Sequence, residues 1–398
     1  MKIRRWSFKM TPVRWVLIIV ALMGILFSIF RLATGLGFST NLNDDWPWGL
    51  WIILDLTAVA LAGAGYSMAV LAHTLHIKDF AVLARRGMLI SLLGYIFVLA
   101  TLMLEIGRWD NAYRPLISWG YYSPLFEVFI AISFYMVIQA FEFGEVVTER
   151  VLKPLHKPIK FVLPVVFFLG ALIPFGHQAS LGAVYLIFPD KLDPLWYTSN
   201  LPWFFLITSF FAGPAMVLID TLWSSRAYNY QLDIKALVRL ARVGGYLMAG
   251  YLIWKIYDLF VLGAAQNMFA GDFKGNLFLV ELGLGVLLPV IICFSPWIQT
   301  KKGMLSFALL CVFGVAMNRF NVVFTGMFDA LGPTYVPNFV EWVISIGLIA
   351  LVLIMYLFIV ENFNIYNQHH GTHEKSREKA YTQHRKTSLY GGKQYNQG

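Results

Sequence analysis

Long apolar runs recur along this chain, and one of them carries an acidic residue. The run from Trp46 to Leu71, WPWGLWIILDLTAVALAGAGYSMAVL, is longer than the core helix of a soluble protein requires. Its length is sufficient to cross the roughly 30 Å hydrocarbon core of a bilayer. Asp55 lies about nine residues from one end of it, a depth of roughly 13 Å. Because a charge inside a bilayer is costly, an acidic residue there indicates a functional site.

Nine further runs are also long enough to span a membrane, counting stretches of about 18 apolar residues or more. The chain is 58% hydrophobic and only 13% charged, whereas soluble proteins carry about 25% charged residues. We therefore predict an all-α integral membrane protein with ten transmembrane helices. The predicted spans are 15–34, 46–72, 87–107, 123–143, 159–177, 201–223, 238–263, 276–298, 303–325 and 338–361.

The basic residues give these spans an orientation. With the loops taken alternately, 24 of the 31 Lys and Arg residues fall on one side and four on the other. By the positive-inside rule both termini are cytoplasmic, in a multi-pass protein of the cell membrane. The net charge of +9 follows from this asymmetry, so nucleic acid is not an expected partner. We divide the chain into a basic N-terminus (1–14), a membrane domain (15–361) and a polar, disordered cytoplasmic tail (362–398).

A weak internal repeat relates spans two to five to spans six to nine. Both copies run in the same direction through the membrane, which predicts two similar four-helix bundles with spans one and ten beside them. The matching features are Trp46-Pro47-Trp48 with Leu201-Pro202-Trp203, Gly94-Tyr95 with Gly245-Tyr246, Glu127 with Glu281, and Gly170 and Gly182 with Gly314 and Gly326.

The first predicted bundle gathers ionisable residues in its outer half. They are Asp55, Glu105, Arg108, Glu127 and His177. Glu105 and Arg108 are three residues apart, which places them on one face of a helix. Three acids beside one fixed cation leave at least one carboxyl group able to hold or exchange a proton. We favour a proton-exchanging site over the alternative, a structural network of ion pairs.

The second predicted bundle has a more balanced set of charges, for which we favour a structural network. Its members are Lys255, Asp258, Glu281, Arg319 and Glu341. Near the cytoplasmic ends of their spans, Glu142 and Asp220 are either parts of a proton path or helix-end residues.

No prosthetic group of the chain's own is expected. The His residues offer no deep pair for a haem, and Cys293 and Cys311 cannot ligate an iron–sulfur cluster by themselves. Sequence motifs for nucleotide binding are absent, and we predict no metal site, although the His-rich tail could bind metal weakly. A quinone remains possible, because it needs only an apolar cleft with one or two protonatable, hydrogen-bonding residues.

Several segments together resemble the NrfD/polysulfide-reductase family of membrane subunits, in the branch of the hydrogenase subunit HybB and the sulfite-reduction subunit DsrP. The resemblance covers spans two to ten. It is carried by PWGLWIILDL, ARRGMLISLLGY, EIGRWDN, SPLFEVFIAISFY, LIPFGHQASLG, AGDF and NFVEWVISIGLIA.

This resemblance implies a haem-free subunit that exchanges electrons between menaquinone and a ferredoxin-like iron–sulfur subunit on the outer face. Its larger complex would contain a multihaem cytochrome, a hydrogenase or a sulfur-metabolism enzyme. His177 is expected to hydrogen-bond a ring oxygen, and Glu127 to exchange the accompanying proton. Asp55 and Glu105 would relay that proton, and Arg108 would hold the carboxylates. Trp46 is a further expected contact of the quinone.

Two other functions fit parts of the pattern. The repeat and the buried charges are also found in transporters or proton channels, although broken helices at the midplane are few. A passive membrane anchor is the third possibility, but an anchor has no use for three carboxylates inside lipid. The loops 35–45, 108–122 and 178–200 form either an interfacial aromatic belt or a docking face for an outer partner.

Overall fold

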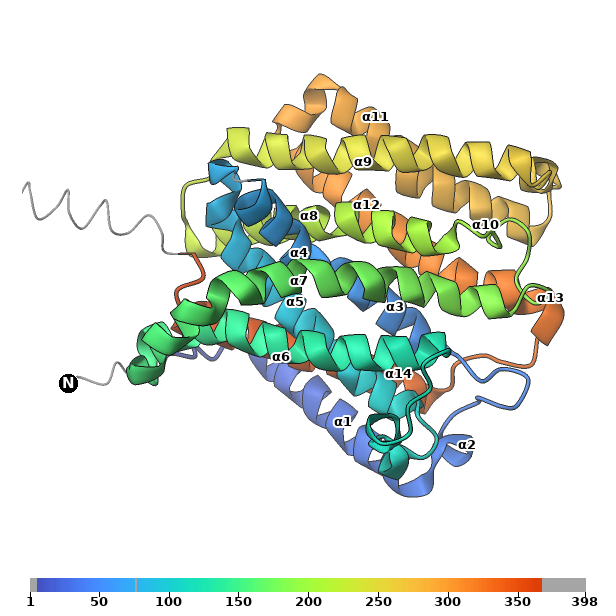
Figure 1. Ribbon diagram of the computed structural model, residues 1–398, viewed down its shortest axis with the longest axis horizontal. Helices are drawn as coiled ribbons and strands as arrows, with labels where there is room; N and C mark the ends of the chain where they lie inside the picture. Colours follow the sequence, from blue (N-terminus) through green and yellow to red (C-terminus); the bar gives the residue numbers. More distant parts are fainter. Residues whose placement is uncertain (1–5, 76, 367–398) are drawn as a thin grey trace, which may run out of the picture.

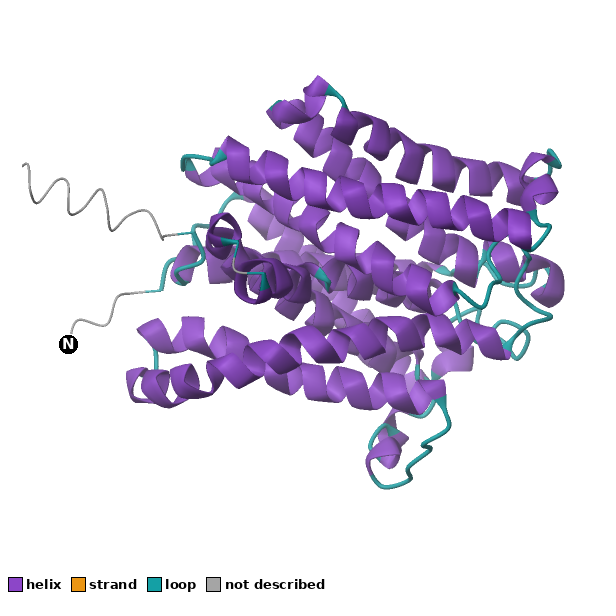
Figure 2. Ribbon diagram, turned by 45° about the horizontal axis from the view of Figure 1, so that its top comes forward, coloured by secondary structure: helices purple, strands orange, loops and turns teal. Residues whose placement is uncertain are grey.

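The computed structural model describes residues 6–75 and 77–366. Every regular element in these ranges is a helix (Figure 2). Ten helical segments are long and apolar enough to cross a membrane, so the predicted all-α fold and span count are confirmed. A short helix, α2 (Leu36–Ser39), and another, α13 (Phe328–Leu331), lie in connections.

The spans agree closely with the apolar runs of the sequence. Most are single long helices, whereas the second and the eighth each contain a π-helical turn, η1 (Val70–Thr74) and η7 (Gly283–Leu287). The helices are α1 (Pro12–Thr34), α3 (Leu50–Ala62), α4 (Ala64–Ala69), α5 (Lys78–Glu105), α6 (Pro124–Arg150), α7 (His156–Ala183), α8 (Leu201–Tyr228), α9 (Ile234–Val261), α10 (Phe273–Leu282), α11 (Leu288–Phe294), α12 (Lys301–Val323) and α14 (Phe339–Asn362).

Local sequence signals set where several helices begin. The Asp233 carboxylate accepts a hydrogen bond from the Ala236 amide at 3.1 Å at the start of α9. Asn338 and Glu341 form a reciprocal capping box at the start of α14. Such caps satisfy backbone amides that have no partner inside the helix. Proline occupies the first turn of α6 and α8. It is favoured there because it lacks a backbone amide hydrogen, which would have no partner inside the helix.

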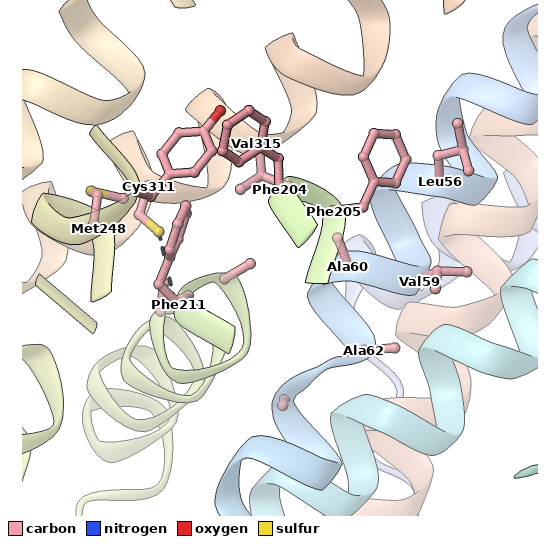
Figure 3. Packing of buried hydrophobic residues seen from close by; sticks show 14 of the residues in the cluster. Leu56, Val59, Ala60, Ala62, Phe204, Phe205, Phe211, Met248, Cys311 and Val315 are labelled. Atoms are coloured by element: carbon pink, nitrogen blue, oxygen red, sulfur yellow. Dashed lines mark hydrogen bonds between the residues drawn. The ribbon is translucent and has the colours of Figure 1, made fainter. Parts of the chain in front are cut away.

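The first bundle consists of α3 to α7 and packs against α8 of the second. Apolar side chains of α3 such as Leu56 and Ala60 lie beside Phe205 of α8 in one continuous core (Figure 3). On the other side of α8, Phe211 accepts a weak hydrogen bond from the Cys311 thiol of α12 through its carbonyl oxygen. Helix α8 is therefore the shared wall of the two bundles.

The second bundle consists of α8 to α12. Figure 1 shows α9 and α11 at one edge of the molecule and the pair α1 and α14 at the opposite edge. Helices α10, η7 and α11 together form the broken eighth span, which packs on α12. The two predicted bundles are therefore observed, and the first and last spans, α1 and α14, lie together beside the first bundle.

The flanking helices α1 and α14 form a tight pair. A Cβ atom on Gly24 would lie 2.5 Å from the Cα of Gly347, so only glycine permits this approach of the two backbones. At their cytoplasmic ends Arg14 forms an ion pair with Glu361, and Ser7 exchanges two hydrogen bonds with Asn362. Residues 6–11 and 362–366 consequently lie at the same end of the molecule, as an even number of spans requires. Most of the predicted tail, residues 367–398, lies outside the described residues.

Candidate functional site

Asp55 is enclosed in the outer half of the first bundle. It lies on the second turn of α3 and is 3% exposed. Thr101 of α5 faces the carboxylate, but Oδ1 has no hydrogen-bond partner among the described residues. A buried polar atom without a partner costs roughly 1–3 kcal/mol, so such atoms mark places where a ligand or water binds.

Glu105 lies at the outer end of α5, where it ties that helix to the start of the second span. Its Oε1 accepts a hydrogen bond from the Gly49 amide at 3.2 Å. Oε2 is buried without a described partner. The buried Arg31 of α1 and Glu341 of α14 both lie within electrostatic range of this carboxylate. The Arg31 guanidinium donates to the Ile106 carbonyl at 2.8 Å, so it lies at the same depth as Glu105.

Trp46 packs against Tyr335 beside the carboxyl groups of Glu105 and Glu341. Its indole stacks on Tyr335 with a centroid distance of 5.9 Å, and its Nε1 donates to the Gly332 carbonyl at 2.8 Å. The Tyr335 hydroxyl donates to Glu341 at 2.6 Å and accepts from the Leu50 amide at 2.9 Å. Burial and the hydrogen bond to Glu341 raise the pKa of Tyr335, so its hydroxyl remains a donor. Trp46 is thus fully engaged in packing the outer ends of the spans.

His177 lies on the inward face of α7 and is completely buried. Neither ring nitrogen has a hydrogen-bond partner among the described residues. The ring of Tyr95, on α5, lies 6.0 Å from the imidazole, and the Tyr95 hydroxyl is also buried without a partner. Asp55 is within electrostatic range of Tyr95. Asp55, Tyr95 and His177 therefore form one set of buried groups with unused hydrogen-bonding capacity, which we call the outer polar site.

Of the other predicted site residues, Glu105 and Trp46 lie beside this set, whereas Glu127 and Arg108 are exposed. Glu127 is exposed on the first turn of α6; its Oε1 faces α7, 4.0 Å from where a Cβ of Gly176 would stand. Arg108 forms an ion pair with Asp110 at 2.9 Å, and its side chain is 76% exposed. The predicted shared helical face of Glu105 and Arg108 is not observed, because α5 ends at Glu105. Arg108 therefore does not hold the buried carboxylates.

Arg31 and Tyr95 were missed by reasoning from the sequence. Arg31 is a cation inside an apolar run, and that alone could have marked it as a partner of a buried acid. Tyr95 gave no signal of its own, because tyrosines are frequent in membrane spans. Glu341, assigned from sequence to the second bundle, lies instead beside Glu105 and Tyr335.

The second bundle contains a hydrogen-bonded network around Glu281, although Asp258 Oδ2 is buried without a partner among the described residues. Glu281 accepts from Trp196 at 2.9 Å and from Asn318 and Asn321 at 2.7 Å each. Arg319 donates to Asn318 at 2.6 Å and to Thr208 at 2.8 Å. The buried Lys255 ammonium donates to the Leu195 carbonyl at 3.0 Å. This network joins α8, α10 and α12 and matches the structural role expected for it.

A further buried cluster closes the cytoplasmic end between the bundles. The Arg86 guanidinium lies over the rings of Tyr230 and Tyr366 at 4.7 and 4.5 Å. It lies 3.7 Å from the Asp220 carboxylate, which accepts from Tyr356 and Tyr366. Asp220 thus joins α5, α8 and the end of α14 and is not a lone helix-end residue.

No cluster of metal-ligating residues adjoins these groups in the described part of the chain. No three His, Cys, Asp or Glu residues come together there as metal ligands would. A depression of about 70 Å³ on the outer face is lined by Asp44, Trp48, Phe188 and Lys191, among others. A second hollow of about 350 Å³, within the roughly 300–1,000 Å³ of ligand pockets, is lined by Arg114, Ser118 and Phe126, among others. Neither hollow is lined by Asp55, Tyr95 or His177, so the outer polar site is a candidate on its unpartnered polar atoms alone.

These features define a multi-pass, all-helical membrane protein with an enclosed polar site near its outer face. The chain belongs to the polysulphide reductase, NrfD family, whose sequence model matches residues 38–330. The resemblance noted in the sequence is therefore confirmed.

Three relatives match this chain over more than four fifths of their length. A probable Ni/Fe-hydrogenase 2 b-type cytochrome subunit of Escherichia coli is 29% identical over 89% of this chain and 93% of its own length. The integral membrane subunit of a menaquinone reductase from Nitratidesulfovibrio vulgaris is 26% identical, covering 82% and 84%. An Hdr-like menaquinol oxidoreductase integral membrane subunit of Archaeoglobus fulgidus is 23% identical, covering 87% and 92%.

Proposed function

We propose that this chain is the quinone-interacting membrane subunit of a respiratory oxidoreductase complex. It would pass electrons between menaquinone or menaquinol and an iron–sulfur partner on the outer face. The family and the names of two relatives, a menaquinone reductase and a menaquinol oxidoreductase subunit, support this proposal. The relative from Escherichia coli is named as a probable hydrogenase subunit, which supports membership of a multi-subunit complex.

One observation carries the assignment to residues: the outer polar site contains three buried side chains whose polar atoms are unused. Asp55, Tyr95 and His177 come from α3, α5 and α7, and each has at least one buried polar atom without a described partner. The oxygen atoms of a quinone ring need hydrogen-bond donors and a source of protons, and these residue types supply both. The donor set therefore fits a quinone head group.

Each residue has a role that follows from its position. When bound, menaquinone supplies two-electron, two-proton redox chemistry. His177 would donate a hydrogen bond to one ring oxygen, with Tyr95 beside it as a second donor. Asp55 would hold the exchanging proton, and Glu105 would be the next acid toward the outer face. Glu127, at the exposed end of α6, would stand at the rim of the site.

Two buried residues beside the outer polar site, Arg31 and Trp46, support these roles. Arg31 is the buried cation nearest Glu105 and takes the place expected for Arg108. Trp46, held between Gly332 and Tyr335, would support the site from behind and would not contact the ring. These two residues would fix the geometry of the entrance to the second span.

A haem of the chain's own is a poorer fit to the described residues. Axial ligation between helices needs two side chains at matched depth. His156 and His177 lie at opposite ends of α7, roughly 30 Å apart at about 1.5 Å per residue. They cannot ligate one iron, and no step of the proposal passes through a haem.

The partner would dock on the outer loops. The loop 108–122 exposes a group of large apolar side chains, namely Trp109, Tyr113, Leu116, Ile117, Trp119, Tyr121 and Tyr122. Exposed apolar patches of this kind mark interaction surfaces. Arg108 and Arg114 lie in the same loop, so the partner would contact a surface of aromatic rings and positive charges.

Binding of a fluorescent quinol analogue of the hydroxyquinoline N-oxide type to the purified full chain tests the proposal. We expect saturable binding by the wild type and roughly tenfold or greater weakening in His177→Ala, the loss of about one hydrogen bond to a buried group. Glu127→Gln should also weaken it, by less.

His156→Ala is the matched control. His156 lies on the same helix at the cytoplasmic end, 3.1 Å from Thr148, and its loss should leave binding unchanged. Absence of binding in the wild type, or equal binding in His177→Ala, would favour an anchor or transporter.

A further inference from the structure

The second membrane span is interrupted at Gly63, between the end of α3 and the start of α4. In an unbroken helix the Gly63 amide would donate to the Val59 carbonyl, four residues back. Here it donates to the Ala60 carbonyl at 3.2 Å, three residues back. The interruption therefore leaves the Val59 carbonyl without a partner in its own helix.

The backbone at this interruption is pressed against α8, the wall shared by the two bundles. A Cβ atom on Gly63 would lie 2.8 Å from the Ser209 carbonyl oxygen of α8. A Cβ atom on Gly213 of α8 would lie 2.5 Å from the Ala64 nitrogen. Neither approach leaves room for a larger residue, so α8 fixes one side of the interrupted span.

Gln178 of α7 supplies the partner that the Val59 carbonyl lacks. Its Nε2 donates to that carbonyl at 3.0 Å, and the side chain is 1% exposed. A backbone carbonyl left unpaired inside a bilayer is costly, and side chains of neighbouring helices satisfy such groups where a membrane helix is interrupted. The hydrogen bond therefore determines where α7 lies against α3.

Both ends of this hydrogen bond adjoin members of the outer polar site. Gln178 directly follows His177 on α7, and Val59 lies one turn from Asp55 on α3. Consecutive residues of a helix point about 100° apart, so Gln178 can face α3 while His177 faces Tyr95 of α5. Neither nitrogen of His177 has a hydrogen-bond partner among the described residues. The direction of the imidazole consequently depends on the placement of α7.

We propose that Gln178 is a positioning residue of the outer polar site. Its hydrogen bond to the Val59 carbonyl holds α7 against α3 and thereby directs the His177 imidazole toward the quinone ring. The proposal rests on the proposed quinone function and adds to it a residue that does not itself touch the quinone. The role requires a hydrogen-bond donor on a side chain long enough to reach from α7 to α3.

Binding of the hydroxyquinoline N-oxide analogue to the purified full chain tests this role. Gln178→Met keeps the approximate size of the side chain and removes the donor. We expect binding to weaken roughly fivefold or more, as the loss of about one hydrogen bond predicts. In a His177→Ala background the same substitution should have little further effect, because Gln178 acts through His177.

Lys255→Met is the matched control. Lys255 also donates from a buried side chain to a backbone carbonyl, that of Leu195 at 3.0 Å, but it does so in the second bundle. The two variants lose the same kind of hydrogen bond and gain the same residue. Thermal unfolding in detergent measures the stability of each. We expect Lys255→Met to keep the wild-type analogue affinity in its folded fraction.

A second pair of variants keeps the test decisive if Gln178→Met does not fold. Gln178→Glu preserves the length of the side chain and can donate when its carboxyl group is protonated. At acidic pH it should bind the analogue nearly as well as the wild type does at that pH. Gln178→Asn keeps the amide but is one methylene shorter, so it should not restore binding.

The outcomes separate this inference from the quinone function. Wild-type affinity in Gln178→Met, or equal weakening in Lys255→Met, would leave Gln178 a structural residue only. A loss as large in the His177→Ala background as in the wild type, or equal binding by the glutamate and asparagine variants, would also overturn the positioning role alone. Absence of analogue binding by the wild type would refute the quinone function and this inference with it.

Discussion

The central acid of the second bundle and the polar side chains of the outer polar site differ in how many hydrogen bonds they make. In the second bundle Glu281 accepts three hydrogen bonds from three side chains. In the first, Asp55, Tyr95 and His177 are equally buried but leave polar atoms unused. A satisfied network stabilises a fold, whereas free hydrogen-bonding capacity inside a membrane is a cost that a ligand can offset. This difference supports the proposal that the ligand binds in the first bundle.

Matched positions of the repeat show this divergence most directly. Glu127 and Glu281 stand near the starts of corresponding spans, yet Glu127 is exposed on α6 and Glu281 is 1% exposed between α10 and α12. A glutamate at the same place in the repeat is therefore exposed at the end of a helix in the first bundle. In the second bundle it is buried and holds a hydrogen-bonded network together.

The largest effect is expected from Asp55→Asn. The amide preserves size but cannot exchange a proton, so menaquinone reduction by the reconstituted complex should fall by about 100-fold or more. Because the buried Oδ1 of Asp55 has no hydrogen-bond partner among the described residues, the thermal unfolding temperature should stay close to that of the wild type. Turnover at the wild-type rate would remove Asp55 from the mechanism and would weaken the contrast between the bundles.

Glu281→Leu should show the opposite pattern. It removes the shared acceptor of Trp196, Asn318 and Asn321 and leaves three buried donors unpaired. We expect a loss of about 3 kcal/mol in stability, measured by thermal unfolding in detergent, with quinol-analogue affinity preserved in the folded fraction. A variant that melts normally but fails to bind would show that the second bundle contributes to the site.

Sequence reasoning found the fold because its signals are local. Span length, helix periodicity and the distribution of Lys and Arg each depend on neighbouring residues, and bilayer physics permits few alternatives. Asp55 and His177 were found in the same way, since a polar residue in an apolar run is conspicuous. Tyr95 was not, because only the packing of α5 against α7 makes it part of the site.

Errors arose where depth alone was used to infer contact. Arg108 and Glu341 were placed at the correct membrane level, but depth does not fix which neighbour a side chain meets. Helix α5 ends at Glu105, which carries Arg108 into the outer loop. The last span packs beside α1 and α5, which brings Glu341 to Glu105 and not to Glu281.

Tyr66→Phe should have a smaller effect and tests how the bundles are joined. The Tyr66 hydroxyl of α4 hydrogen-bonds to Ser209 of α8 across the boundary between them. Its removal should cost about 1 kcal/mol of stability, measured by thermal unfolding. The control is Tyr246→Phe, since that side chain is 62% exposed on α9. Equal unfolding temperatures for the two variants would show that this bond does not hold the bundles together.

The smallest effect on the chain itself is expected from Arg108→Gln, and it sharpens the contrast with Arg31. The hydrogen bond from Arg108 lowers the pKa of Asp110. This pair can therefore stabilise the fold only above the ordinary pKa of an aspartate, and that contribution disappears as the pH falls through the lowered value. Since both side chains lie open to solvent, neither the unfolding temperature nor quinol-analogue binding should change at neutral pH.

Arg31→Gln, by contrast, removes a fully buried cation beside Glu105. It should alter both the unfolding temperature and quinol-analogue binding. If Arg108 serves the outer partner, its substitution should show only in recovery of the intact complex through a tag on this chain. A loss of analogue binding in Arg108→Gln would place the loop 108–122 over the site and extend the functional region of the first bundle to its outer surface.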